Sequence, residues 1–206
     1  GTAKLHQLAV GNAEQKATLF RAAENTGMHR MYPSVCCVAG SSEVSVIRGD
    51  SLALAPLDFM KIDIEGYEPF ALQGFAETMK QSPQMKILCE FSPLSIIEAR
   101  FSPVVFLNSL RDQGFHLVAH QGHAWTQITY EDITQHLEAI PDVAIVEFEK
   151  TLKASDGNQA IADHCVAFLT RHAYPRPIVE NLLFVAPSAW PSVCNKLGIE
   201  MGAALN

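Results

Sequence analysis

The chain has 206 residues, 48% hydrophobic and 18% charged, a composition typical of a globular protein that builds a real core. Its net charge of −7 and its lack of lysine or arginine runs argue against nucleic-acid and anionic-membrane partners. No stretch resembles a membrane span or a signal peptide. Five cysteines without C-x-x-C spacing predict a reducing, cytoplasmic location.

The first 50 residues predict short strands separated by irregular segments. Residues 5–10 and 17–21 read as two strands joined at the turn dipeptide Gly11-Asn12, which predicts a hairpin. Turn-forming residues punctuate the irregular segment 22–43. Residues 44–48 alternate apolar and polar side chains, as expected of a third strand.

Residues 57–69 are the most informative segment of the chain. Residues 57–64 predict a central, buried strand, and Pro69 falls in the first turn of the following helix, where its missing N–H costs nothing. Three acids fall within six positions near the end of this segment: Asp63, Glu65 and Glu68. Burying an unpaired carboxylate is costly, and open α/β sheets bind ligands at the carboxyl ends of their strands, so this cluster indicates a site. A solvated turn that caps the next helix is the alternative reading.

The next predicted strand, residues 85–89, also ends in a carboxylate, Glu90. Glu65 and Glu90 would thus end consecutive parallel strands and line the same crevice. The order of elements predicts an α/β fold with an antiparallel hairpin at one edge of the sheet. The later elements are a helix at 103–113, a hairpin at 115–119 and 126–129, a helix at 133–139 and a final strand at 143–148.

The sequence divides into two parts near residue 150. Residues 1–150 contain all of the chemistry-bearing motifs and form the predicted main domain. Residues 151–206 begin with a linker-like segment, followed by a helix at 160–171 and an apolar run at 178–186. This extension reads either as a cap on the sheet or as the start of another domain.

With these strand ends in view, the first 150 residues or so resemble the FkbM-type family of class I S-adenosylmethionine-dependent methyltransferases. The strongest match is to the family signature K-x-D-x-E-G-x-E, here Lys61, Asp63, Glu65, Gly66 and Glu68. The stretch C-E-F-S-P at 89–93 resembles the ending of the family's next strand, and residues 8–11 with the Asn25-Thr26-Gly27 turn resemble its "AlG…N-x-G" region. Residues 46–52 resemble the strand before its L-D-x-L turn, with Gly49 where Leu is usual.

The resemblance implies a Rossmann-like methyltransferase sheet that uses S-adenosylmethionine to methylate a hydroxyl of a sugar or secondary metabolite. The family's D-x-G-x-N-x-G turn and its second strand ending in an acid have no counterpart here, so no cofactor-binding residue is assigned. By family topology the chain begins at the third strand. We therefore expect a fragment whose activity requires residues N-terminal to Gly1, with a split enzyme or a degenerate descendant as alternatives.

The resemblance and the strand ends together suggest roles for individual side chains. Asp63, followed by Glu65, is the candidate for removing the acceptor's proton or orienting it, and Glu90 would orient a substrate hydroxyl from the neighbouring strand. Four further residues are candidate substrate contacts: Asn25, Gly27, Lys61 and Glu68. For these four, a plain turn, a salt bridge and a favourable helix-end charge are equally good explanations.

Two other functions remain open at this stage. A non-catalytic descendant would use the carboxylate crevice to bind a polyol or a partner protein. A metal-dependent variant would use Asp63, Glu65 and Glu90 as hard oxygen ligands for Mg²⁺ or Ca²⁺, although no metal site is predicted. The expected partner is a small-molecule hydroxyl acceptor, and no motif indicates an oligomeric state.

Overall fold

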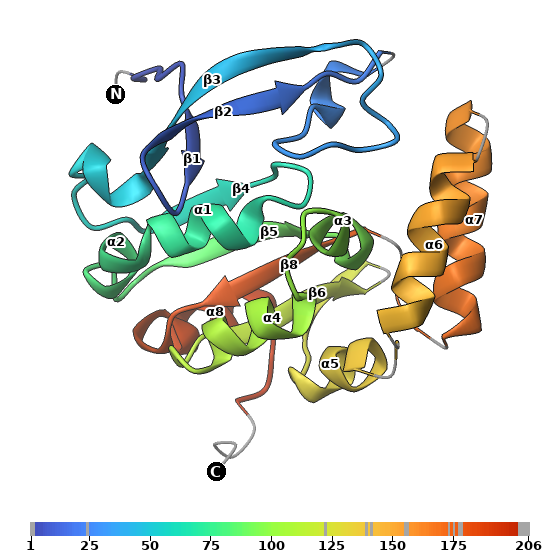
Figure 1. Cartoon of the computed structure of the whole chain (residues 1–206). Coiled ribbons are helices and arrows are strands. Elements are labelled where there is room, and N and C mark those ends of the chain that lie inside the picture. Colours follow the sequence, from blue (N-terminus) through green and yellow to red (C-terminus); the bar gives the residue numbers. More distant parts are fainter. Residues whose placement is uncertain are drawn as a thin grey trace.

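The structure, a computed structural model, describes residues 3–23, 25–121, 123–138, 140, 142–154, 157–172, 174, 176 and 179–201. Its first sheet consists of β1 (Ala9–Gly11), β2 (Gln15–Phe20) and β3 (Ser41–Arg48), in the order β1-β3-β2 (Figure 1). β3 is parallel to β1 and antiparallel to β2. The predicted hairpin of the first two strands is therefore wrong, because a strand from about 30 residues later in the sequence lies between them.

The second sheet has five strands in the order β4-β5-β8-β6-β7. Its strands are β4 (Phe59–Ile62), β5 (Lys86–Phe91), β6 (His116–Gln121), β7 (Ala124–Gln127) and β8 (Glu180–Val185). β4 and β5 are parallel, β8 is antiparallel to both of its neighbours, and β6 and β7 form the predicted hairpin. Side chains of β5 and β8 such as Ile87, Phe91 and Phe184 are fully buried in the main core, so these two strands form its centre.

The extension contributes a central strand to this sheet. Leu183 of β8 pairs with Leu88 of β5 on one side and with Val118 of β6 on the other. Residues 151–206 were expected to form a cap or another domain. Instead, β8 of this extension lies between β5 and β6 and completes the sheet, because without β8 these two strands would not be connected.

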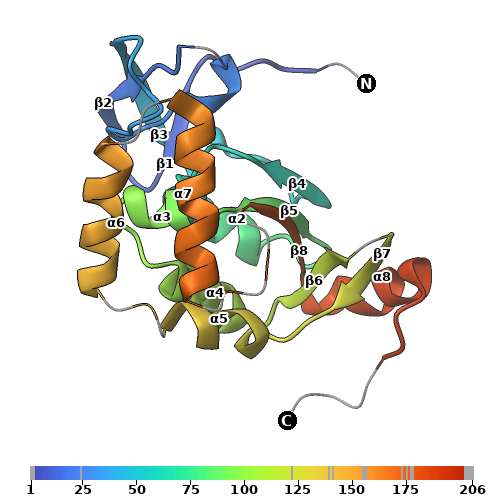
Figure 2. The same ribbon diagram turned by 90° about the vertical axis from the view of Figure 1, so that its right-hand side faces the viewer.

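Helices cover both faces of the five-stranded sheet. On one side lie α1 (Glu68–Gly74), α2 (Ala76–Lys80), α3 (Pro93–Glu98), α4 (Pro103–Arg111) and α5 (Glu131–Glu138). α8 (Trp190–Leu197) packs Trp190 and Val193 against Val118 and Val185 in a separate cluster. α6 (Asp142–Ala154) and α7 (Gly157–Arg171) stand together as a helical pair beside the sheets (Figure 2). None of the described helices is long and apolar enough to cross a membrane.

The predicted strand at 143–148 is wrong, because these residues belong to α6. Ile145, Phe148 and Leu152 are three and four residues apart, which is the spacing of one helix face. Phe148 and Leu152 are buried and Ile145 packs against the same core, whereas Val146 is 49% exposed. The β-branched residues of this segment are typical of a strand, but its burial follows the helical period.

β4 also differs from its prediction as a central, buried strand. Among the described residues it pairs only with β5, so it lies at the edge of its sheet. Phe59 is 55% exposed, while Ile62, at the end of the strand, is buried. β1 likewise pairs only with β3 in the described structure. β1 and β4 are thus edge strands of their sheets in the described structure, and both line the cavity described next.

Candidate functional site

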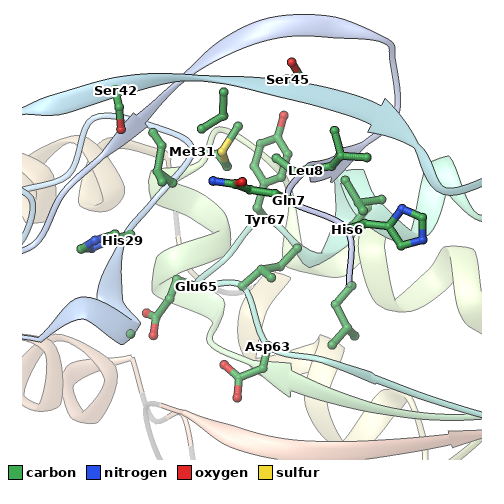
Figure 3. Close-up of a pocket in the computed structure, with 18 of the residues that line it drawn as sticks. His6, Gln7, Leu8, His29, Met31, Ser42, Ser45, Asp63, Glu65 and Tyr67 are labelled. Atoms are coloured by element: carbon green, nitrogen blue, oxygen red, sulfur yellow. The ribbon is translucent and has the colours of Figure 1, made fainter. Parts of the chain in front are cut away.

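A cleft of about 1290 Å³ separates the two sheets (Figure 3). Its walls come from the segment before β1, from β1 to β3, from residues 27–31, from β4 with its following loop, and from α1. Asp63 and Glu65 lie near each other on one side, with His6, Leu8 and Met31 above them in this view. Of the residues predicted for the site, the lining includes Gly27, Lys61, Asp63 and Glu65.

The loop after β4 owes its shape to the Glu65-Gly66 dipeptide. Both residues have positive φ angles, 61° at Glu65 and 93° at Gly66. A side chain at Gly66 would place its Cβ 2.6 Å from the Ser95 backbone and 2.7 Å from Tyr32 Oη, so only glycine fits. Positive φ is uncommon for a glutamate, which indicates that surrounding contacts hold this residue in place.

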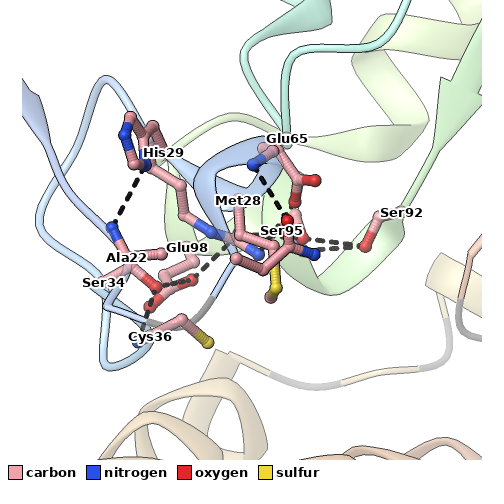
Figure 4. A network of polar contacts seen from close by, with 12 residues as sticks. Ala22, Met28, His29, Ser34, Cys36, Glu65, Ser92, Ser95 and Glu98 are labelled. Atoms are coloured by element: carbon pink, nitrogen blue, oxygen red, sulfur yellow. Dashed lines mark hydrogen bonds and ion pairs between the residues drawn. The ribbon is translucent and has the colours of Figure 1, made fainter.

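Those contacts come chiefly from Arg30, which is 6% exposed. Its Nη2 donates to Glu65 Oε2 at 3.1 Å, and its Nη1 donates to Ser95 Oγ at 3.0 Å and contacts Glu98 Oε2 at 3.5 Å. Tyr32 Oη donates to the Glu65 carbonyl oxygen at 2.6 Å. The side chain and the main chain of Glu65 are thus both fixed (Figure 4). Sequence analysis missed Arg30, a single basic residue in an irregular segment with no motif around it.

Glu68 lies behind the loop and outside the cleft lining. It is 1% exposed, and its Oε1 accepts a hydrogen bond from the Ile64 N–H at 2.8 Å. Burial is the main cause that raises the pKa of its carboxyl group. In this position Glu68 closes the loop between Asp63 and Glu65 from within, although the sequence suggested that it contacts substrate.

Asp63, Glu65 and Glu90 come together as one cluster. Each can place a carboxylate oxygen within 4.8 Å of the others. Ile62 of β4 pairs with Cys89 of β5, so the residues that follow them emerge side by side. Glu90 lies within β5, which runs to Phe91, rather than after its end. Glu65 and Glu90 thus lie close together, as expected, but only Glu65 of the two lines the cleft.

The cluster carries more negative than positive charge. Burial, followed by repulsion from Glu65, Asp63 and Glu68, raises the pKa of Glu90 to about 7. Burial also raises the pKa of Glu65, and Arg30 opposes that shift. Lys61 Nζ lies 2.5 Å from Asp63 Oδ2 on the exposed side of the cluster, and this hydrogen bond raises the pKa of Lys61. Near neutral pH, the cluster can therefore take up a proton or attract a cation.

The remaining predicted contacts lie at the rim. Asn25 is exposed, and its Oδ1 accepts a hydrogen bond from the Gly27 N–H at 2.9 Å, which caps the short helix Thr26–Met28. Gly27 lines the cleft, whereas Asn25 does not. His29 and Tyr67 also line it (Figure 3).

Comparison with known proteins gives one match. The methyltransferase FkbM domain matches residues 2–174. No curated protein and no solved structure gives a significant match. The matched region contains β1 to β7, the cleft and all three clustered carboxylates. Because the match spans most of the 206 residues, the chain belongs to the FkbM methyltransferase family.

Proposed function

We propose that this chain is the catalytic part of an S-adenosylmethionine-dependent O-methyltransferase that acts on a hydroxyl of a sugar or secondary metabolite. The observation that carries the proposal is the cluster of Asp63, Glu65 and Glu90 beside a large cleft, in a chain of the FkbM family. Acceptor hydroxyls must lose a proton during methyl transfer, and a carboxylate whose pKa lies near the working pH is suited to receive it.

The residues of the cluster would divide the work. Bound S-adenosylmethionine supplies an electrophilic methyl group and a positive sulfonium charge, which suits the excess of carboxylates in the cleft. Asp63, the exposed member, contacts the acceptor hydroxyl, and Glu90, with a pKa of about 7, holds the proton that leaves it. Glu65 stays in place through Arg30. Such general-base catalysis typically contributes about 10²–10⁴-fold, and positioning supplies much of the rest.

In this proposal, further strands beside β4 also take part in cofactor binding. The support is that β4 and β1 each leave one edge without a partner strand in the described structure, and both line the cleft. Unpaired strand edges are templates for additional strands. Coding DNA upstream of Gly1 that encodes an apolar strand, a glycine-rich turn and a second strand ending in an acid would support this view. An in-frame stop codon there would contradict it.

The function is tested by transfer of a labelled methyl group from S-adenosylmethionine to a panel of hydroxylated sugars and apolar alcohols. Asp63→Asn should lower turnover by about 10²–10⁴-fold. Asp58→Asn is the matched control, because Asp58 is an exposed aspartate just before β4, at its other end. Turnover that stays unchanged in Asp63→Asn removes Asp63 from the mechanism.

A metal-assisted form of the reaction is the second candidate. Asp63, Glu65 and Glu90 bring hard oxygen ligands within 4.8 Å of one another, which suits Mg²⁺ or Ca²⁺. Loss of methyl transfer in EDTA, with recovery on adding Mg²⁺, would favour this form. Full activity in EDTA would leave the proton-accepting role of the carboxylates as the better account.

A non-catalytic descendant gains no support from the family match. Such a protein would bind a polyol or a partner without affinity for S-adenosylmethionine, so a cofactor titration distinguishes it from the enzyme. A cytoplasmic location belongs to the proposal as well, supported by the five free cysteines, none of which forms a disulfide.

A further inference from the structure

A second cavity, of about 700 Å³, lies between α3, the α6–α7 pair and the segment that leads into β8. Its walls are mainly apolar, with contributions from Leu94, Phe148, Leu152, Ile161, Leu169 and Val179. The volume falls within the range of small-molecule sites, about 300–1,000 Å³. None of the three clustered carboxylates lines it, whereas Arg30, which pairs with Glu65, does.

Unpartnered polar atoms gather around this cavity. Six buried side-chain atoms have no hydrogen-bond partner in the part of the chain that the structure describes. Two of them, Arg30 Nε and Tyr174 Oη, belong to residues that line the cavity and are each 6% exposed. A third, Glu180 Oε1, belongs to the ion-pair partner of the lining residue Arg176, and a fourth, His164 Nε2, to a ring stacked on Phe148. Burying such groups without partners is costly, so their concentration here points to a ligand that offers hydrogen bonds.

Each of the charged side chains around the cavity already has an ion-pair partner. Arg176 Nη1 lies 2.9 Å from Glu180 Oε2, and Arg30 pairs with Glu98 and Glu65 at 3.5 and 3.1 Å. A charged ligand would find no free opposite charge among these groups and would pay for its desolvation. An uncharged ligand that both donates and accepts hydrogen bonds would satisfy Tyr174, Arg30 and Glu180.

The cavity also shares a wall with the catalytic cleft. In the segment 27–31, Gly27, His29 and Met31 line the cleft, whereas Met28 and Arg30 line the second cavity. From His29 onward the backbone is extended, so successive side chains point to opposite sides. This segment therefore separates the second cavity from the cleft, and Arg30 connects the two through its ion pair with Glu65.

We propose that the second cavity binds an uncharged, mainly apolar molecule that carries a hydroxyl group. The site is separate from the place of the proposed reaction, since none of the three clustered carboxylates lines it. The apolar body fills the space among α3, α6 and α7, and the hydroxyl group hydrogen-bonds with the unpartnered atoms of Tyr174 and Arg30.

Calorimetric titration of the full chain with 2-naphthol, without cofactor, tests the site. We expect saturable binding by the wild type. Val166→Trp should abolish this binding, because Val166 lines the cavity from α7 and a tryptophan there would occupy part of it. The protein should still fold, since Val166 is 52% exposed and the larger side chain can be accommodated. Ala167→Trp is the matched control at the next, exposed residue, which does not line the cavity, and should bind like the wild type.

Two further titrations test the polar part. Tyr174→Phe should weaken 2-naphthol binding by about two- to tenfold, the worth of one hydrogen bond. The anionic analogue 2-naphthalenesulfonate should bind the wild type at least about tenfold more weakly than 2-naphthol, because no cation is free. Unchanged affinity in Tyr174→Phe, or equal affinity for the anion, would overturn this part.

Absence of saturable 2-naphthol binding, or equal binding by Val166→Trp, would overturn the site itself. These outcomes are independent of methyl transfer. If 2-naphthol binds as expected while no methyl transfer occurs, the proposed function fails and the cavity stands. If methyl transfer occurs without this binding, the function stands and the second site proposed here is wrong.

Discussion

The two cavities of this protein lie on either side of one wall, the segment 27–31, yet their polar groups differ in charge balance and in hydrogen-bond partners. The cleft of about 1290 Å³ holds clustered carboxylates whose charge is not balanced. Around the smaller cavity of about 700 Å³ the charges are paired, and what is left over is hydrogen-bonding capacity. Excess charge suits proton transfer, whereas unpartnered hydrogen-bonding atoms in an apolar setting suit recognition.

The shared wall explains how so short a segment serves both cavities. Arg30 reaches Glu65 with its Nη2 atom, while its Nε remains without a partner and the residue lines the smaller cavity. One buried side chain thereby holds a carboxylate of the cleft and contributes a donor beside the second cavity. Substitutions in the wall (residues 27–31), in the loop after β4 and in the carboxylate cluster test this difference between the two cavities.

Changing the wall should have the largest effect. Arg30→Met leaves Glu65 and Glu98 without their buried cation and should lower the free energy of unfolding by about 3–5 kcal/mol, as measured by urea denaturation. Arg48→Met is the control, because the Arg48 side chain is 42% exposed and its pair with Asp50 should contribute at most about 1 kcal/mol. Similar losses in both variants would mean that Arg30 does not hold the wall together.

A change in the loop after β4 should have the next-largest effect on stability. Gly66→Ala combines a positive φ with a clash against the Ser95 backbone and should cost about 2–4 kcal/mol. Gly40→Ala is matched in backbone conformation, with φ of 94°, but its Cβ would meet nothing within 4 Å. Its cost should be about 1 kcal/mol. Equal costs by urea denaturation would show that backbone strain, and not the close packing of the loop, accounts for the glycine.

The charge of the cluster should appear as a pH-dependent stability. The pKa of Glu90 is raised from 4.5 to about 7 in the folded chain, so the folded state binds more protons between these values and stability falls as pH rises through them. Glu90→Gln should therefore be more stable than the wild type at pH 8 by roughly 1 kcal/mol, a value reduced because Glu90 is only half-buried, with the advantage vanishing near pH 4.

Thermal melts at the two pH values measure this difference. Glu43→Gln is the control, since the Glu43 side chain is 71% exposed on β3 and outside the cluster. If the stability of Glu90→Gln relative to the wild type does not increase with pH, the carboxylates of the cleft do not carry an unbalanced charge.

The smallest effect is expected at the exposed side of the cluster. Lys61 and Asp63 form an ion pair whose side chains are 54% and 40% exposed. Lys61→Met should change the free energy of unfolding by less than about 0.5 kcal/mol, because solvent screens such pairs. A loss above about 1 kcal/mol in urea denaturation would show that Lys61 is a structural member of the site.

Sequence analysis was most successful where structure is set locally. The strand before Asp63, the Glu65-Gly66 turn, the proline in the first turn of α1 and the hairpin of β6 and β7 all depend on residues close to one another in the chain. The meeting of Glu65 with Glu90 was predictable as well, because parallel strands end at one edge of a sheet.

Long-range pairings were beyond the reach of a single sequence. Nothing near β1 and β2 indicates that β3 separates them, and nothing in the apolar run at 178–186 indicates that β8 would insert between β5 and β6. In α6, β-branched residues imitated a strand over six positions, and only the burial of Phe148 and Leu152 reveals the helical face. Arg30 gains its importance entirely from partners 35 and more residues away.

The central claim is that Asp63, Glu65 and Glu90 act as one proton-accepting cluster. A ¹³C NMR titration of the glutamate carboxyl carbons tests it most directly, with Glu90→Gln to assign the signal. We predict a carboxyl group that titrates near pH 7 in the wild type and at lower pH in Asp63→Asn, where one repelling charge is gone. If the Glu90 signal titrates near the ordinary value of 4.5, or does not move in Asp63→Asn, the three carboxylates are independent and the account is contradicted.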